Sequence, residues 1–161
     1  GRGSLGRPHL AEVLLEKGYT STMHKAYREF LSSESRFYVP KKKLELGKAV
    51  SLIHEAGGLA FAAHPYSLGF KTYPELGKEL LKFKEAGIDG VEAYYAKHDR
   101  YFTRWLLDFA KDNNLLVSGG SDFHGRPKPS IKPGIGYGDL KIPLDVVSKI
   151  KNVIEMKVFS I

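Results

Sequence analysis

The sequence predicts an α/β fold in which parallel strands are joined by crossover helices. Short apolar stretches of strand type alternate along the chain with longer amphipathic stretches of helix type, and connections of helical length favour parallel pairing. Two apolar stretches end in polar side chains, at His64 and at Asp122, and the first of them is entered through Gly57-Gly58. The carboxyl ends of buried strands are where α/β folds place their chemistry, so these two ends are the first candidates for a site.

At 161 residues, with 42% hydrophobic residues, the chain is expected to form one α/β domain over residues 1–161. Pro8 suits the first turn of a helix that runs to about Lys17, and a second helix is expected from about Thr22 to Leu31. The stretch from Ser32 to Lys43, which ends in a run of lysines, is predicted to be a basic loop.

The rest of the chain continues the alternation. Further helices are expected at about Leu46–Ala56, Tyr73–Ala86, Tyr101–Asp112 and Pro143–Lys151, and strands in the stretches that lead to His64, Tyr95 and Asp122. The stretch Arg126–Gly138 is rich in Gly, Pro and Lys and is predicted to be a loop. A final strand is expected at Val153–Ile161.

Asp122 and His124 form an Asp-x-His motif directly after an apolar stretch. In an extended segment, residues two apart point to the same side. The pair could then offer an oxygen and a nitrogen ligand to one metal ion, and the neighbouring glycines leave room for a close approach. The alternative is a helix-capping aspartate beside an exposed histidine.

His64 ends a second apolar stretch and is followed by Pro65. A proline disfavours helical geometry in the residue before it, so an extended His64 at the end of a strand is expected. A single histidine in such a place is often a satisfied core or capping residue. Two strand ends that carry His and Asp-x-His together favour a metal site at His64, Asp122 and His124.

Four motifs in register carry a resemblance to a known family. They are Gly6-Arg7-Pro8-His9-Leu10-Ala11, Ala63-His64-Pro65, Val91-Glu92-Ala93-Tyr94-Tyr95 with His98, and Gly119-Gly120-Ser121-Asp122-Phe123-His124-Gly125. In this order and spacing the chain resembles the second half of a PHP (polymerase and histidinol phosphatase) phosphoesterase. The branch that it resembles most acts on nucleoside bisphosphates and short RNA ends. The resemblance extends from Gly1 to about Leu140.

The resemblance implies a distorted barrel of about seven β/α units, of which this chain would be the C-terminal portion. Family members begin with a His-x-His strand and build a site for up to about three metal ions, whereas no His-x-His occurs here. By the resemblance, His64, Asp122 and His124 are the last three ligands of a larger set. The chain is therefore expected to be a fragment or a processed product that lacks the N-terminal metal-binding half and is inactive alone.

Imidazole and carboxylate ligands would support metal-assisted hydrolysis of a phosphate ester. Mn, Zn and Fe all accept this mixture of nitrogen and oxygen, and a metal-activated water makes a Ser or Cys nucleophile unnecessary. The expected activity is a metal-dependent phosphoesterase acting on phosphate monoesters or diesters of nucleotides or nucleic-acid ends. The alternative is a noncatalytic basic α/β module that binds nucleic acid or a partner protein.

Positively charged side chains near the same rim would hold the substrate phosphate. Arg7 matches the family's Gly-Arg-x-His motif, and its alternative is a surface ion pair. His9 could bind substrate or position Arg7, or be a satisfied histidine. His98 is the candidate for phosphate contact or proton donation. Glu92 either orients a ligating imidazole or pairs with a nearby Lys or Arg, and a structural role is favoured for it. Lys128 is either a nucleic-acid backbone contact or solvated surface.

The formal net charge of +7 favours phosphorylated partners: a small molecule, a nucleotide or an oligonucleotide. The chain has no cysteine, which excludes disulfides and thiolate ligands. No apolar run is long enough to span a bilayer, and cytoplasmic residence is expected. An open sheet edge would invite association, either with the absent half of the barrel or in an oligomer.

Overall fold

The structure is a computed structural model that describes residues 6–40, 43–125 and 128–158. The chain divides into two compact units, Gly1–Lys43 and Leu44–Ile161, and the single domain expected over residues 1–161 stays a prediction. In the first unit, α1 (Arg7–Glu16) and α2 (Met23–Ala26), which continues as the π-helical turn η1 (Tyr27–Leu31), confirm the two predicted helices. The side chain of Thr22 caps α2 by accepting a hydrogen bond from Lys25 N.

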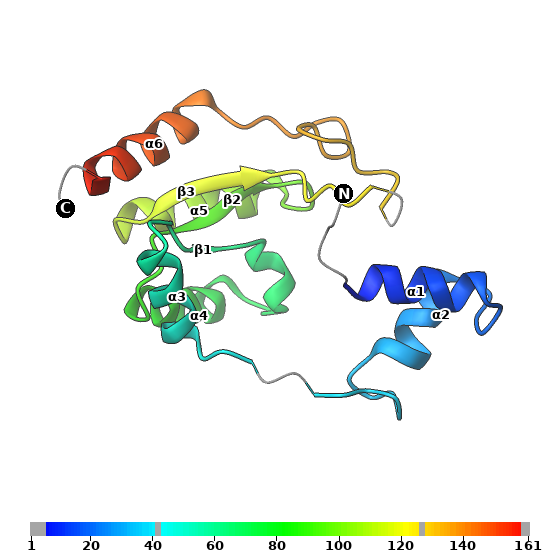
Figure 1. Ribbon diagram of the computed structural model, residues 1–161. Coiled ribbons are helices and arrows are strands. Elements are labelled where there is room, and N and C mark those ends of the chain that lie inside the picture. Colours follow the sequence, from blue (N-terminus) through cyan, green and yellow to red (C-terminus); the bar gives the residue numbers. More distant parts are fainter. Residues whose placement is uncertain (1–5, 41–42, 126–127, 159–161) are drawn as a thin grey trace. The chain divides into compact units, whose positions relative to one another are not determined.

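The second unit is built on a three-stranded parallel sheet with the order β1-β2-β3. Its elements, shown in Figure 1, are α3 (Leu46–Glu55), β1 (Phe61–Ala62), the 3₁₀ turn η2 (Pro65–Leu68), α4 (Tyr73–Glu85), β2 (Gly90–Tyr95), α5 (Arg100–Asp112), β3 (Leu116–Gly120) and α6 (Leu144–Val158). Spatial order equals chain order, and a helix lies between each pair of strands. The predicted α/β fold with crossover helices is therefore confirmed.

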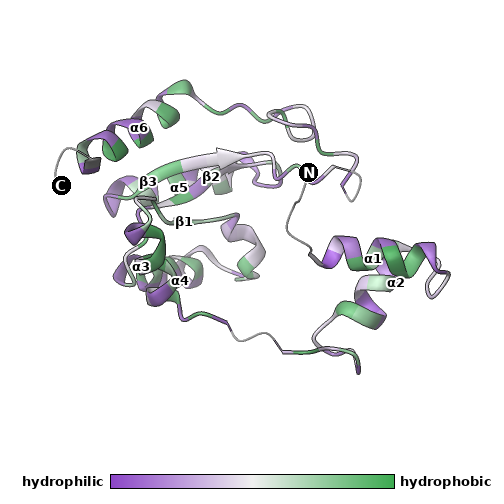
Figure 2. Cartoon of the chain, in the orientation of Figure 1, coloured by the Kyte–Doolittle hydropathy of each residue, from purple (hydrophilic) through white to green (hydrophobic). Residues whose placement is uncertain are grey.

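The core of this unit surrounds β2, the central strand. Val91 and Ala93 are fully buried there and pack with Leu80 of α4 and Leu106 of α5, which are also fully buried. The helices that flank the sheet alternate hydrophobic and hydrophilic residues along the chain (Figure 2), as expected when one face of each helix covers the sheet. The sheet is thus held by its crossover helices, and its carboxyl edge stays available for polar side chains.

The expected final strand at Val153–Ile161 is wrong as far as the structure describes it. Residues 153–158 continue α6, and residues 159–161 lie outside the described part. Val153 and Ile154 have strand-type side chains, but tertiary packing overrides that preference. Val146 is buried, and Val153 lines a shallow cavity with Ile88 and Leu115. A helix presents these apolar residues to the sheet on one face.

Asp89, just before β2, ties together the amino-terminal edge of the sheet. Its carboxylate accepts hydrogen bonds from His54 Nε2 at 2.7 Å, from Ala60 N at 2.6 Å and from Lys157 Nζ at 3.1 Å. Burial by itself would raise the pKa of Asp89, but these hydrogen bonds outweigh it and hold the pKa below its usual value. The charged carboxylate therefore stabilises the junction of α3, β1, β2 and α6.

We expect Asp89→Asn to lower the free energy of unfolding by about 1–3 kcal/mol at neutral pH, because a partly buried network loses its charged acceptor. Since the folded-state pKa is lowered, the stabilisation is present above the unfolded pKa of about 3.9 and is lost as the pH falls through the folded value. Urea unfolding at several pH values measures it. Asp108→Asn, in an exposed pair with Arg104, is the control, and equal effects of the two variants would contradict the prediction.

Candidate metal and phosphate site

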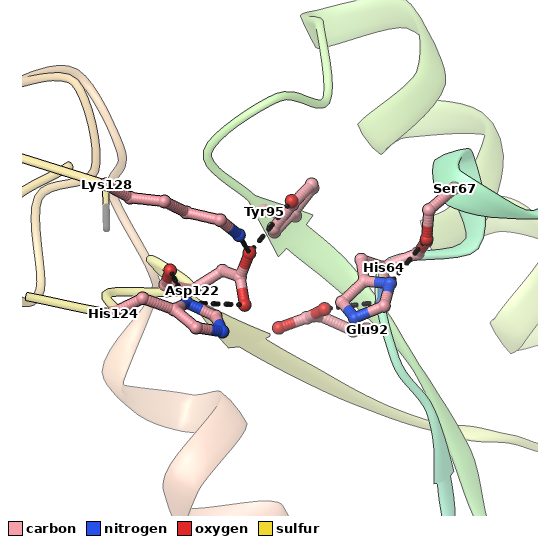
Figure 3. Close-up of polar contacts among 7 residues, drawn as sticks. All are labelled: His64, Ser67, Glu92, Tyr95, Asp122, His124 and Lys128. Atoms are coloured by element: carbon pink, nitrogen blue, oxygen red, sulfur yellow. Dashed lines mark hydrogen bonds and ion pairs between the residues drawn. The ribbon is translucent and has the colours of Figure 1, made fainter. Parts of the chain in front are cut away.

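The carboxyl ends of the three strands bring a set of polar side chains to one edge of the sheet. His64 follows β1, Glu92 and Tyr95 belong to β2, and Asp122 and His124 follow β3. Figure 3 shows the Glu92 carboxylate between the His64 imidazole and the Asp122 carboxylate. The structure thus brings the three predicted metal ligands to the same edge, because parallel strands end at the same side of a sheet.

His64 is not extended, contrary to the prediction from Pro65: its φ is 34° and its ψ is 63°, in the left-handed region. Hydrogen bonds on both sides of the residue hold this conformation. The His64 N–H donates to Glu92 Oε2 at 2.6 Å, and the His64 carbonyl accepts from Ser67 N at 2.9 Å and Ser67 Oγ at 2.7 Å. Such a backbone costs about 1–3 kcal/mol and persists where surrounding contacts over-determine it.

Asp122 also departs from the predicted extended geometry. The strand β3 ends at Gly120, and Asp122 has a φ of 56°, a region that aspartate tolerates better than most residues. The turn brings His124 Nδ1 within 2.6 Å of the Asp122 carbonyl oxygen and within 3.4 Å of Asp122 Oδ1. The two side chains therefore lie together because of a turn, and not because of strand periodicity.

The hydrogen bonds of His64 and His124 define which ring nitrogen is free. The Ser67 hydroxyl donates to the His64 carbonyl, so its oxygen accepts from His64 Nδ1–H at 2.5 Å. His124 Nδ1–H donates to the Asp122 carbonyl. When neutral, both imidazoles then carry an unprotonated Nε2. A ring held at one nitrogen by an acceptor, with the other nitrogen bare, is the usual arrangement of a metal-binding histidine.

A β-bulge in β2 sends both Glu92 and Tyr95 to the site. Residues three apart in a regular strand point to opposite faces, but the register with β3 is interrupted between Glu92 and Tyr94. The close approach of the strands here requires Gly119, where a Cβ would lie 2.6 Å from Tyr94 Cβ. Tyr95 can then donate its hydroxyl hydrogen to Asp122 Oδ2 at 3.2 Å.

The charges of the site are strongly coupled. Burial would raise the pKa of Asp122, but the ion pair with Lys128, the charge of His124 and the Tyr95 hydrogen bond hold the pKa below its usual value. Burial, together with the negative charge of Asp122, raises the pKa of Tyr95 to about 12. Tyr95 is therefore a neutral donor at physiological pH, and Asp122 is a carboxylate.

Glu92 and Lys128 also lie at this edge of the sheet. The sequence allows Glu92 to lie beside a ligating imidazole, although it favours a structural role, whereas it does not predict the contact of Lys128 with Asp122. A charged residue inside the apolar strand Val91-Glu92-Ala93 was a usable signal for Glu92, whereas nothing local distinguished Lys128 from the other lysines of its loop. Burial raises the pKa of Glu92, the His64 N–H opposes this, and the charge of Asp122 adds to it. Two carboxylates near each other in a half-buried position favour a bound cation.

We expect Glu92→Gln to raise the melting temperature of the chain at neutral pH by an amount on the order of 2 °C. A raised folded-state pKa means that stability is lost as the pH rises through it, and Gln keeps an acceptor for the His64 N–H without the buried charge. The gain should vanish below the unfolded pKa of about 4.3. Thermal unfolding at several pH values, with the exposed Glu55→Gln as control, checks this. A lower melting temperature for Glu92→Gln would contradict it.

His98, a predicted substrate-binding residue, has its ring held by contacts within its own unit. His98 Nδ1–H donates to the Ala93 carbonyl at 2.9 Å, and the ring packs edge-on against Tyr95 and Phe102. Its Nε2 is buried without a hydrogen-bond partner among the described residues, and burial lowers the pKa of His98. His98 is thus neutral and has no proton on Nε2, so proton donation from that atom would require the ring to rearrange.

Arg7 and His9 belong to the first unit, and their predicted substrate contacts stay predictions. The guanidinium of Arg7 lies 5.9 Å from the ring centroid of Tyr38, a cation–π distance. His9 Nδ1 accepts a hydrogen bond from Gly6 N at 3.0 Å and so caps the start of α1. Each side chain therefore has a local structural role within its own unit.

The donor types at the edge of the sheet fit a divalent metal ion, since they combine bare imidazole nitrogens with carboxylates. In the described part of the chain, however, no three His, Cys, Asp or Glu side chains are arranged so that they could hold a metal ion. A cleft of about 390 Å³ lies at the end of β2, where Tyr95 and His98 share its lining with the basic side chains of Arg100, Arg104 and Lys141.

None of the helices in ranges 6–40, 43–125 and 128–158 is long and apolar enough to cross a membrane.

Comparisons with known proteins agree with this fold, although no family model matches the chain. The chain is 32% identical over 134 residues to the 5'-3' exoribonuclease Rnm of Escherichia coli, and this alignment covers 82% of the chain and 44% of that protein. It is 32% identical over 138 residues to the 3',5'-nucleoside bisphosphate phosphatase of Chromobacterium violaceum, and this alignment covers 84% of the chain and 45% of that protein. The sequence similarity therefore extends over most of this chain.

A solved structure from Bifidobacterium adolescentis, described as a metal-dependent phosphoesterase, superimposes with a TM-score of 0.67 and 30% identity over 90% of this chain and 49% of that chain. The fold and the sequence similarity thus define an α/β protein that is related to phosphoesterases. The chain belongs to the PHP family and forms a partial PHP domain. It spans about half the length of the relatives that it matches.

Proposed function

We propose that the chain supplies the C-terminal half of the active site of a metal-dependent phosphoesterase that hydrolyses phosphate esters of nucleotides or nucleic-acid ends. The observation that carries the proposal is the gathering of His64, Asp122 and His124 at one sheet edge, with both Nε2 atoms bare and Glu92 beside them. The relatives described as an exoribonuclease and a bisphosphate phosphatase support the substrate class.

In this proposal His64, Asp122 and His124 hold a divalent ion of Mn, Zn or Fe. When bound, such an ion acidifies a water and neutralises charge on the phosphoryl oxygens. Ser67 and the Asp122 carbonyl orient the two imidazoles, and the Tyr95 hydroxyl orients Asp122 Oδ2. The basic cleft beside Tyr95 would attract the rest of a polyanionic substrate through Arg100, Arg104 and Lys141.

The remaining ligands would come from a further part of the barrel, either on the same polypeptide or on a separate chain. The surface that suits it is the outer edge of β1 and the exposed apolar side chains of α3, where Leu52 is 41% and Ile53 is 40% exposed. An unpaired strand edge beside such side chains favours addition of another β/α unit. This half of the barrel is the partner that we propose, besides the substrate.

A noncatalytic basic module that binds nucleic acid or a protein is the second candidate, and the net charge of +7 favours it. The test is hydrolysis of a nucleoside 3',5'-bisphosphate and of a short 5'-phosphorylated RNA by the complete protein in Mn²⁺, with and without chelator. Turnover that the chelator abolishes supports the phosphoesterase. Binding of the RNA without turnover in any of the three metals supports the module.

Within the complete enzyme, we expect Arg7→Ala and His98→Ala to lower hydrolysis by roughly 10- to 1000-fold. The reason for Arg7 is loss of a charge-assisted phosphate contact, and the reason for His98 is loss of a proton donor whose ring rearranges when the substrate binds. Bound metal should barely change. Turnover and metal content measured on the same preparations check this. Lys17→Ala, at the other end of α1, is the control for Arg7. Wild-type turnover of His98→Ala would show that its ring only packs against Tyr95 and Phe102.

A further inference from the structure

Lys128 places a cation of the chain itself on a predicted metal ligand. Its Nζ lies 2.6 Å from Asp122 Oδ2, with the lysine side chain 37% and the aspartate side chain 18% exposed. Figure 3 shows the lysine reaching across to this carboxylate. The length and the partial burial make the contact a charge-assisted hydrogen bond rather than a solvated surface pair.

Oδ2 of the Asp122 carboxylate has little acceptor capacity left for a metal ion. Oδ2 accepts from Lys128 Nζ and also from the Tyr95 hydroxyl at 3.2 Å, and a carboxylate oxygen has two lone pairs. Oδ1 faces His124 Nδ1 at 3.4 Å. Any cation that coordinates Oδ2 must therefore displace one of these two donors. It would displace the Lys128 ammonium, because two positive charges repel each other and the Tyr95 hydroxyl is neutral.

Backbone hydrogen bonds hold the main chain at Lys128 independently of its side chain. Lys128 N donates to the Gly125 carbonyl at 3.1 Å, and the Lys128 carbonyl accepts from Ile131 N, also at 3.1 Å. Ile131 is 2% exposed and anchors the segment. The long, flexible lysine stem can thus release Asp122 by a change of side-chain rotamer, without unfolding its loop.

We propose that Lys128 is a built-in counter-cation, which neutralises Asp122 in the metal-free chain, competes with the divalent ion for Oδ2, and is released by that ion to contact the phosphate of the substrate. The inference rests on the proposed function, because it takes Asp122 as a metal ligand. Without Lys128, the negative charges of Asp122 and Glu92 would face each other at the same edge. By linkage, what stabilises the metal-free state weakens metal binding by the same factor.

The first test is calorimetric titration of the 161-residue chain with Mn²⁺ and Zn²⁺. We expect Lys128→Met, which keeps the length of the stem without its charge, to bind metal about 5- to 50-fold more tightly than wild type. Lys132→Met, in the same loop, removes an equal charge and should change the affinity by less than about twofold. His124→Ala marks the loss of the site.

Unchanged or weaker affinity of Lys128→Met, in a series where His124→Ala still loses metal, would overturn the inference and leave the proposed function standing. Equal tightening by Lys132→Met would also overturn it, since net charge alone would then explain the effect. Absence of metal binding in every variant would overturn the inference, because removal of the competitor is what should reveal the site. The proposed function is decided separately, by hydrolysis with the complete protein.

A second test leaves the sequence unchanged and so does not depend on the folding of a variant. Lysines of the wild-type chain are acetylated at limiting reagent, with and without Mn²⁺, and the modified positions are quantified by mass spectrometry. We expect the metal to raise the rate at Lys128 by about threefold or more, as for an ammonium freed from a charge-assisted hydrogen bond, and to leave Lys132 unchanged. A rate at Lys128 that the metal does not raise would contradict its release.

Discussion

Asp122→Ala and His124→Ala are expected to remove metal and phosphoesterase activity together from the complete enzyme. Each takes away one donor of the proposed set. His124→Ala also removes the hydrogen bond from His124 Nδ1 to the Asp122 carbonyl, whereas Asp122→Ala keeps that carbonyl and removes only the carboxylate 3.4 Å from Nδ1. Loss of even an outer-sphere partner typically costs about 10- to 100-fold in metal affinity or activity, so a lost ligand should cost on the order of 100-fold or more.

The measurement is bound metal by elemental analysis and turnover of a nucleoside bisphosphate on the same preparations. Asp145→Ala, in the exposed pair with Lys149, and His24→Ala, in the first unit, are matched controls that should keep both properties. Retention of full metal content by Asp122→Ala and His124→Ala would remove these residues from the proposed site.

The isolated chain is expected to have little or no phosphoesterase activity in any metal concentration that leaves it folded. The described residues do not arrange three metal-binding side chains around one point, and the chain spans about half the length of its relatives. Catalysis by more than one metal needs a fixed spacing between the ions, which three ligands on one side cannot impose. The difference from the complete protein should be on the order of 1000-fold or more in turnover.

Initial rates on the bisphosphate substrate, for the 161-residue chain and for the complete protein at equal concentration, measure this difference. Mixing the chain with a separately produced N-terminal half should restore part of the activity if the β1 edge and α3 form the docking surface. Robust turnover by the chain alone, abolished by chelator, would show that its own residues make a sufficient site.

Much of the architecture could be predicted because its signals are local. Thr72 and Glu75 form a capping box at the start of α4, and Asp99 caps α5. Apolar periodicity distinguishes these helices from the strands between them. The same patterns place His64 and Asp122 at strand ends, where parallel pairing makes one shared edge. The fold class and the position of the candidate ligands therefore follow from the sequence.

The geometry of the site was decided by contacts between residues far apart in the chain. Glu92 accepts the His64 N–H across 28 residues, and Tyr95 reaches Asp122 across 27. Such contacts place His64 in the left-handed region where Pro65 predicted an extended residue, and a bulge that only the pairing with β3 creates turns Tyr95 toward the site.

The sequence by itself thus determined which elements form, in which order, and where the candidate ligands stand. Tertiary structure alone decided the conformations of His64 and Asp122, the helical end of α6 and the inclusion of Glu92 and Lys128. The physical reason is the distance along the chain over which each kind of interaction acts. Helix caps, prolines and periodicity act over a few residues, whereas a carboxylate finds its hydrogen-bond donors only after the sheet has brought distant segments together.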